Sequence, residues 1–116
     1  MAETLLYQGV AVNPANGLRV RLGHNVETLS GTKTLVPQDA QFQILDPDGN
    51  KTVVLPAEEA SQGLWFVIKN AAGGSETITV DDDNGGEVDT LAQNRFGVFV
   101  CDGSTWQSAI GEVTFA

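Results

Sequence analysis

The sequence has few basic residues and a single cysteine, and both shortages exclude classes of function. Six Lys and Arg residues stand against fifteen Asp and Glu residues, which gives a formal net charge of −9 at pH 7. Because phosphate groups are bound by clustered Lys and Arg, this balance argues against nucleic acid and against anionic lipid as partners. Cys101 has no second cysteine to pair with, so no intrachain disulfide forms, and we expect folding in a reducing cytoplasm.

Long apolar runs are also missing. The longest, "LWFVI" at 64–68, is far too short to span a bilayer. The first ten residues lack the basic and apolar regions of a signal peptide. No window shows an apolar stripe at helical spacing, so we expect neither a membrane segment nor a helical domain.

What the chain does contain is alternation of apolar and polar residues in short stretches separated by turn residues. Hydrophobic residues make up 41% of the chain, and thirteen glycines suit a fold rich in turns. The stretch "LRVRL" at 18–22 is typical, with leucine and valine on one face and arginine on the other. The pattern predicts an all-β fold, an antiparallel β-sandwich or flattened barrel of roughly eight to ten short strands, with an extended N-terminal arm.

Two stretches carry specific expectations about strand pairing. "QFQIL", "DPDGN" and "TVVL" follow one another over 41–55, which predicts a hairpin, because Pro47 and Gly49 suit a tight turn. The stretch "LWFVIKN" at 64–70 is apolar on both faces. It therefore predicts a central strand that is covered on both sides.

The N-terminal third differs from the rest, and we divide the chain into an N-terminal arm with the first short strands (1–36) and a sandwich body (37–116). Residues 1–36 carry three basic and two acidic residues, a sum of +1, which leaves −10 for the body. Such asymmetry suggests two surfaces with different partners. The alternative is that residues 4–12 form the first strand of the sandwich itself. The candidate partner-contacting residues are Leu5, Leu6, Tyr7, Val10, Arg19 and Arg21.

The acidic stretch "DDDNGGEVD" at 81–89 raises the question of a calcium loop. A loop of the EF-hand type that starts at Asp81 would need a bidentate Glu at its twelfth position, where Ala92 stands. Asn84-Gly85 is instead a favoured hairpin turn, and the "DGS" turn at 102–104 is expected to join the last two long strands. We expect a solvated hairpin end here and no metal site.

No motif for catalysis is present. His24 is the sole histidine and lies in a turn context, and Cys101 alternates with Phe99 in a strand, which predicts a packed thiol. Trp65 and Trp106 could stack a sugar, but both lie in strand patterns that favour core packing. We expect a non-enzymatic protein without catalytic residues or a cofactor.

Three segments in order resemble β-rich modules in the structural proteins of tailed bacteriophages. They are "DAQFQILDPDGNKTVVLP", "GLWFVIKNAAGGSETITV" and "TLAQNRFGVFVCDGSTWQSA", and the stretch that contains them, from Asp39 to Ile110, covers about two thirds of the chain. Modules of this kind recur in small capsid decoration (cement) proteins and in head- and tail-fibre proteins. The N-terminal 36 residues are outside the resemblance.

The resemblance implies a virion structural protein that is often trimeric. A chain of 116 residues leaves no room for a long fibre stalk, so a decoration protein on the outer capsid, bound to the major capsid protein, is the expected function. It would be made in the host cytoplasm and would stabilise the capsid. The alternatives are a short head- or tail-fibre adaptor and, from another class, a carbohydrate-binding β-sandwich that uses one of the tryptophans.

Overall fold

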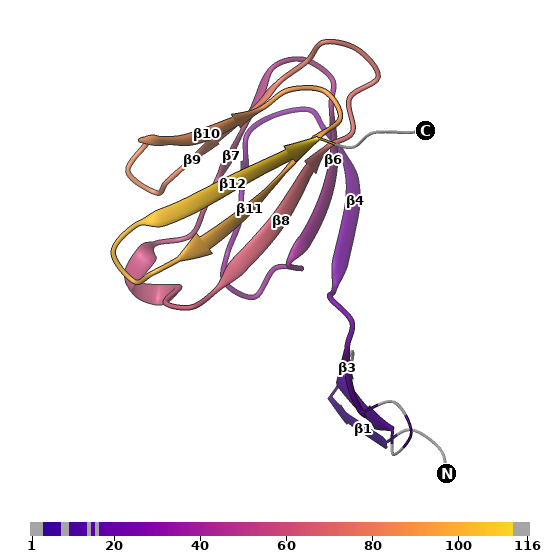
Figure 1. Ribbon diagram of the computed structural model, residues 1–116. Coiled ribbons are helices and arrows are strands. Elements are labelled where there is room, and N and C mark those ends of the chain that lie inside the picture. The colour runs from indigo at the N-terminus through magenta and orange to yellow at the C-terminus, as the bar shows by residue number, and fades with distance from the viewer. Residues whose placement is uncertain (1–3, 8–9, 14, 16, 113–116) are drawn as a thin grey trace.

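The computed structural model describes residues 4–7, 10–13, 15 and 17–112 (Figure 1). Within these ranges the regular secondary structure is strand apart from one short 3-10 turn, and no helix is long and apolar enough to cross a membrane. The elements are β1 Thr4–Tyr7, β2 Val10–Asn13, β3 Gly17–Val20, β4 His24–Leu29, β5 Lys33–Thr34, β6 Phe42–Pro47, β7 Lys51–Val54, the single 3-10 turn η1 Glu58–Ala60, β8 Trp65–Asn70, β9 Ile78–Asp81, β10 Glu87–Leu91, β11 Arg95–Cys101 and β12 Trp106–Glu112.

Two sheets form the body. One has five strands in the order β12-β11-β8-β6-β4, and the other has four in the order β10-β9-β7-β5. Buried apolar side chains from both sheets meet between them, as in a sandwich. The expected all-β sandwich is therefore confirmed. The antiparallel pairing expected throughout is wrong, because β4, β6 and β8 are parallel to one another, as are β5, β7 and β9.

The parallel pairing arises because the chain changes sheet at successive turns. We call each strand–turn–strand unit that crosses from the five-stranded to the four-stranded sheet an arch: β4–β5, β6–β7 and β8–β9. Each arch lies on the previous one, and their backbones are joined where Asp48 N–H donates to the Leu29 carbonyl (3.0 Å) and Ala71 N–H to the Leu45 carbonyl (2.7 Å). The hairpin predicted over 41–55 is consequently wrong: its turn is real, but it joins strands of different sheets.

A buried asparagine holds the third arch in place. Asn70, at the end of β8, is fully buried, and its side-chain amide donates to the carbonyls of Glu76 and Leu91, each at 2.9 Å. Its Oδ1 atom accepts the N–H of Ala72 at 2.9 Å. Because each of these backbone groups would otherwise lack a partner in the interior, the side chain substitutes for sheet pairing at the turn.

The two predicted hairpin ends later in the chain are present. β9 and β10 are antiparallel around the acidic stretch, where Gly85 has φ +86° and its N–H donates to the Asp82 carbonyl. β11 and β12 are antiparallel around Gly103, which has φ +96°. These positive φ angles favour glycine, so the turn residues and the strand pairing agree.

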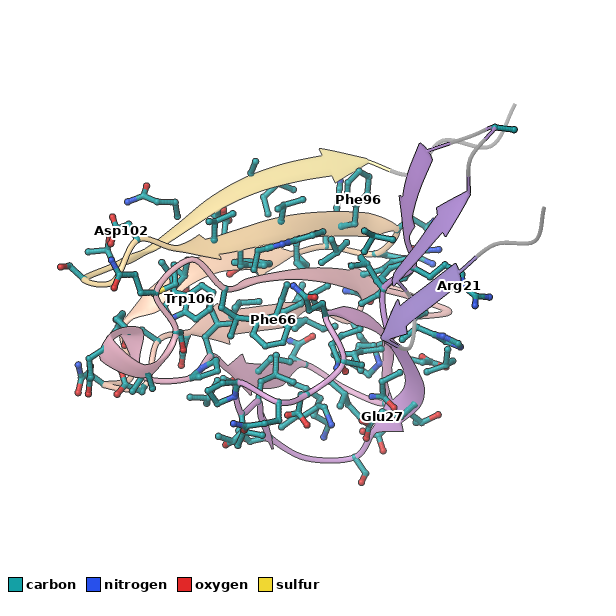
Figure 2. The ribbon with its side chains drawn as sticks, turned by 90° about the horizontal axis from the view of Figure 1, so that it is seen from below. Arg21, Glu27, Phe66, Phe96, Asp102 and Trp106 are labelled. Atoms are coloured by element: carbon teal, nitrogen blue, oxygen red, sulfur yellow. The ribbon has the colours of Figure 1, made fainter. Side chains whose placement is uncertain are left out.

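The core lies between the sheets and is built from one face of each strand. Phe66 on β8 and Trp106 on β12 are both buried, with ring centroids 6.1 Å apart, and Figure 2 shows them between the layers. The indole N–H of Trp106 donates to the Pro56 carbonyl at 3.0 Å. The whole buried cluster is Leu29, Leu35, Leu45, Val53, Leu55, Phe66, Ile68, Ile78, Val80, Leu91, Phe99, Cys101 and Trp106.

The first arch closes the core with polar side chains. Asn25 on β4 donates its side-chain amide to Glu27 Oε1 (2.7 Å) and to Gln43 Oε1 (2.8 Å). Lys33 Nζ lies 2.7 Å from Glu27 Oε1, and the Lys33 and Asn25 hydrogen bonds hold the pKa of Glu27 below its usual value. In stacked-repeat proteins, terminal units with polar outer faces keep the open end soluble, and this arch has that character.

The N-terminal strands form a separate three-stranded antiparallel sheet in the order β1-β2-β3. None of the three pairs with a strand of the body, and Figure 1 shows the small sheet standing beyond the end of β4. Residues 4–12 are therefore not the first strand of the sandwich. Residues 24–34, which the sequence grouped with the arm, form β4 and β5 of the body.

Candidate functional site

The outward side of the five-stranded sheet is apolar, and no other part of the described chain forms a layer over it. Its residues alternate with the core residues along each strand, so they point away from the four-stranded sheet. Several are well exposed: Val26 has 65% of its surface accessible, Val100 41% and Trp65 36%. We call this surface the outer apolar face, and it consists of Val26, Phe42, Ile44, Trp65, Val67, Phe96, Val98, Val100 and Ala109.

Strand register aligns these residues in rows across the sheet. One row runs from Phe42 on β6 through Val67 on β8 and Val98 on β11 to Ala109 on β12. Residues that face one another on neighbouring strands are about 4.5–5.5 Å apart at Cβ, so the row is a continuous apolar strip. A face built this way is regular.

Phe96 extends the strip to the edge of the sheet. Its register partner on β12 is Gly111, and a Cβ placed on Gly111 would lie 2.6 Å from the Phe96 ring. The ring therefore lies against the glycine backbone, where any larger residue would displace it. Glycine in the middle of a strand weakens it, so its presence here indicates that room for the aromatic side chain is required.

The same face carries almost no charge. Among outward-pointing positions of the five strands, Lys69 and Asp46 are the ionised groups, and they cancel. His24, the sole histidine, lies at its margin and is exposed. The excess of acidic residues in this chain of net charge −9 is therefore carried by other surfaces.

A shallow groove of about 470 Å³ lies at the ends of β5 and β7. Its walls are mostly aliphatic, and Asp83 is the charged residue that lines it. Since no pair of groups suited to acid–base or nucleophilic chemistry converges there, the groove offers surface and not a reaction centre. Its lining is Thr34, Leu35, Val36, Pro37, Val54, Leu55, Pro56, Ala57, Ala60 and Asp83.

The acidic stretch is organised as a turn. Asp82 Oδ1 accepts the N–H groups of Asn84 (2.9 Å) and Gly86 (2.8 Å), so this carboxylate holds the hairpin end together. Glu58 lies near it: a hydrogen bond from its own backbone lowers the pKa of Glu58, but desolvation and the charges of Asp83 and Asp82 outweigh this and raise it. Across the described ranges, no three His, Cys, Asp or Glu side chains are grouped so that they could hold a metal ion.

The structure brings the six candidate contact residues together on the N-terminal sheet and next to it. Leu5, Leu6 and Tyr7 lie on β1, Val10 on β2 and Arg19 on β3. Leu5 and Arg19 are both register partners of Ala11, so they occupy one row of the small sheet. Arg21 follows β3, is exposed, and lies at the junction with the body in Figure 2.

Of the cysteine and the two tryptophans considered in the sequence, the cysteine and one tryptophan pack in the core. Cys101 is buried; its thiol donates to the Glu58 carbonyl and accepts the Gly103 N–H, both at 3.4 Å, which confirms a packed thiol. Core packing is confirmed for Trp106 but wrong for Trp65, which lies on the outer apolar face beside Val100. Val100 itself offers no hydrogen bond to a sugar hydroxyl, while Gln107 follows it in the same row of the sheet.

Sequence reasoning missed the outer apolar face, although its signal was present. The apolar run at 64–68 predicts a strand covered on both sides, and β8 is indeed the central strand of its sheet. One side is covered by the four-stranded sheet, while the other is open in the single chain. This exposed apolar side suggests that another molecule covers it.

No protein-family model, no curated protein and no solved structure matches this chain.

Proposed function

We propose that this protein is a non-enzymatic structural component of a tailed-phage virion, a decoration protein that binds the outer capsid surface and stabilises it. The resemblance of residues 39–110 to phage structural modules is the reason for proposing a capsid as the partner. The observation that carries attachment is the N-terminal sheet, β1-β2-β3, which pairs only with itself among the described strands.

A sheet of this size needs a surface to pack on. Its three strands have four residues each, and small isolated sheets are marginally stable in water unless one face is buried. The segment that forms β1 and the start of β2 is rich in apolar residues, namely Leu5, Leu6, Tyr7 and Val10. The major capsid protein is the proposed partner, and packing on it stabilises both the small sheet and the capsid.

Two arginines give the attachment its charge. Residues 1–23 carry Arg19 and Arg21 against Glu3 and sum to +1, while residues 24–116 sum to −10, so the arm is the part of the molecule that an acidic partner attracts. Arg19 and Arg21 would each add roughly 0.2–1 kcal/mol as exposed ion pairs. The body would then face away from the capsid, with its acidic loops in solvent.

The test is co-sedimentation of the protein with undecorated capsids from the phage that encodes it. Replacing both arginines (Arg19→Ala, Arg21→Ala) changes the net charge by −2 and should weaken binding, more so at low ionic strength. The matched control is Gln38→Glu with Gln62→Glu, which makes the same charge change at exposed loop positions of the body. Equal binding by both variants would remove the arginines from the interface, and no binding by the wild type would refute the function.

A further inference from the structure

We infer that the outer apolar face is the surface through which copies of this chain assemble with one another. The partner at this face is a second copy, whose own outer apolar face covers it. The inference does not rest on capsid attachment, which involves the separate N-terminal sheet. It rests on the size of the face, on its charge and on its contrast with the other sheet.

The size of the face suits a specific interface. Five strands at the usual spacing make a surface about 24 Å wide, and three outward residues per strand make it about 20 Å long. That is roughly 500 Å² on one chain, in the range of the largest apolar patch that a monomer shows, and patches of this size are often functional. Two copies packed face to face would cover roughly 1,000 Å², the size at which specific interfaces begin.

The low charge of this face makes it suitable for contact between identical acidic molecules. Two chains of net charge −9 repel each other, so a contact must keep their acidic groups apart. Stacked sheets lie about 10 Å apart, so the outer side of the four-stranded sheet is separated from this face by more than the Debye length of about 8 Å at physiological salt. On the five strands, the ionised residues of the face itself are Lys69 and Asp46, of opposite charge.

The four-stranded sheet shows how this protein builds a face for water. Its outward positions include the register-aligned threonines Thr52, Thr79 and Thr90 and, on β9, the carboxylate Asp81. Most outward positions of the five-stranded sheet instead hold apolar residues, among them Ile44, Val67 and Phe96. Because threonine is enriched in strands just as valine, isoleucine and phenylalanine are, strand propensity does not explain the difference. The difference is explained if another apolar surface covers the five-stranded sheet.

Trp65 adds an independent readout of this assembly. It stands on β8 at the edge of the outer apolar face with 36% of its surface accessible, while Trp106 is buried in the core. Assembly through the face would shield Trp65 and leave Trp106 unchanged. The acrylamide quenching of Trp65, isolated in a Trp106→Phe variant, should therefore fall as the protein concentration rises.

The decisive experiment measures molar mass by light scattering over a range of protein concentrations, without capsids. The wild type should give about twice 12.3 kDa, because the face of one copy covers the face of one other copy. Val67→Thr with Val98→Thr keeps the shape and strand propensity of the face but adds two hydroxyls, and should raise the midpoint concentration for dissociation at least about tenfold. The matched control, Val54→Thr, makes the same change at a half-buried outward position of the four-stranded sheet and should leave the midpoint unchanged.

Each possible result decides the question. A wild type that stays at 12.3 kDa up to hundreds of micromolar overturns the inference, whether or not it binds capsids. If the variant with Val67→Thr and Val98→Thr forms the same oligomer as the wild type, the contact lies elsewhere. This result also overturns the inference. If the wild type is monomeric and the paired threonines abolish capsid binding, the face belongs to a capsid partner. Circular dichroism confirms that each variant folds.

Discussion

Asn25 on β4 donates its side-chain amide to the Oε1 atom of Gln43 on β6, 2.8 Å away. Gln43 is almost completely buried, with 2% of its surface accessible, and its own amide donates to the Ala40 carbonyl at 2.7 Å. Both ends of this buried amide are therefore satisfied. The pair lets the core end at the first arch without an unpaired polar group.

Removing the donor should cost stability. In Asn25→Ala the Oε1 atom of Gln43 loses its partner, so we expect the free energy of unfolding to fall by roughly 1–3 kcal/mol. Urea denaturation followed by circular dichroism measures it. Thr28→Ala, at an exposed position of the same strand, is the control and should change it by less than about 0.5 kcal/mol. Equal effects of the two changes would show that the amide pair contributes nothing.

Gly97 on β11 is the position where an added methyl group is least tolerated in the core. A Cβ there would lie 2.7 Å from the Phe99 ring and 2.9 Å from Ile110 Cδ1. Because Phe99 is fully buried, its ring has no free space to move into. We expect Gly97→Ala to lower the free energy of unfolding by about 1–3 kcal/mol. Gly73→Ala, where no atom lies within 4 Å of the added Cβ, is the matched control, and a similar loss there would contradict the packing argument.

The β11–β12 hairpin should give stability a characteristic pH dependence. The backbone N–H groups of Thr105 and Ser104, together with the Thr105 hydroxyl, lower the pKa of Asp102 from 3.8 to about 2. Since the pKa of Asp102 is lower in the folded than in the unfolded protein, its carboxylate stabilises the fold fully above about pH 3.9. This stabilisation is lost as the pH falls through about 2.

A comparison of melting temperatures tests this dependence. Asp102→Ala should melt below the wild type at neutral pH, and the difference should narrow between pH 4 and pH 2. The other carboxylates are present in both proteins, so their titration cancels in the difference. A difference that stays constant down to pH 2 would mean that the Asp102 charge has no part in holding the turn.

Turn chemistry predicted where the chain reverses but not which strands the reversal joins. Gly85 and Gly103 mark antiparallel hairpins as expected. The turn around Pro47 and Gly49 has equally strong signals, yet it carries the chain from one sheet to the other. A turn signal is local, whereas the choice between a hairpin and an arch depends on how the flanking strands bury their apolar faces against distant segments. Parallel pairing of β4, β6 and β8 was therefore outside the reach of local patterns.

The candidate site, too, was only partly predictable from the sequence. The N-terminal residues were identifiable because composition and charge change along the chain, which is visible in one dimension. The outer apolar face combines residues from five strands, and only the register places Phe42, Val67 and Val98 in one row. Alternation shows that "LWFVI" has two apolar faces, but whether the second face is covered by the same chain or by another depends on the fold.

Deleting β1–β3 should separate folding from attachment. The buried core cluster begins at Leu29, and every strand that pairs in the two body sheets begins at or after His24. Removing residues 2–20 takes away no core residue and no ladder of the body. The truncated protein should melt cooperatively, within a few degrees of the wild type, and should keep the wild-type oligomeric state because the outer apolar face is intact.

The same truncated protein should no longer co-sediment with undecorated capsids, because the proposed attachment sheet is gone. Arg21 remains in it, so Arg21→Ala in the full chain is the control that separates this one charge from the sheet. Unfolding or aggregation of the truncated protein would mean that β1–β3 stabilise the body, contrary to the absence of any strand pairing between them. Retained capsid binding would instead move attachment to the body. Loss of self-association would imply that the small sheet, and not the face of β8 and β11, joins the copies.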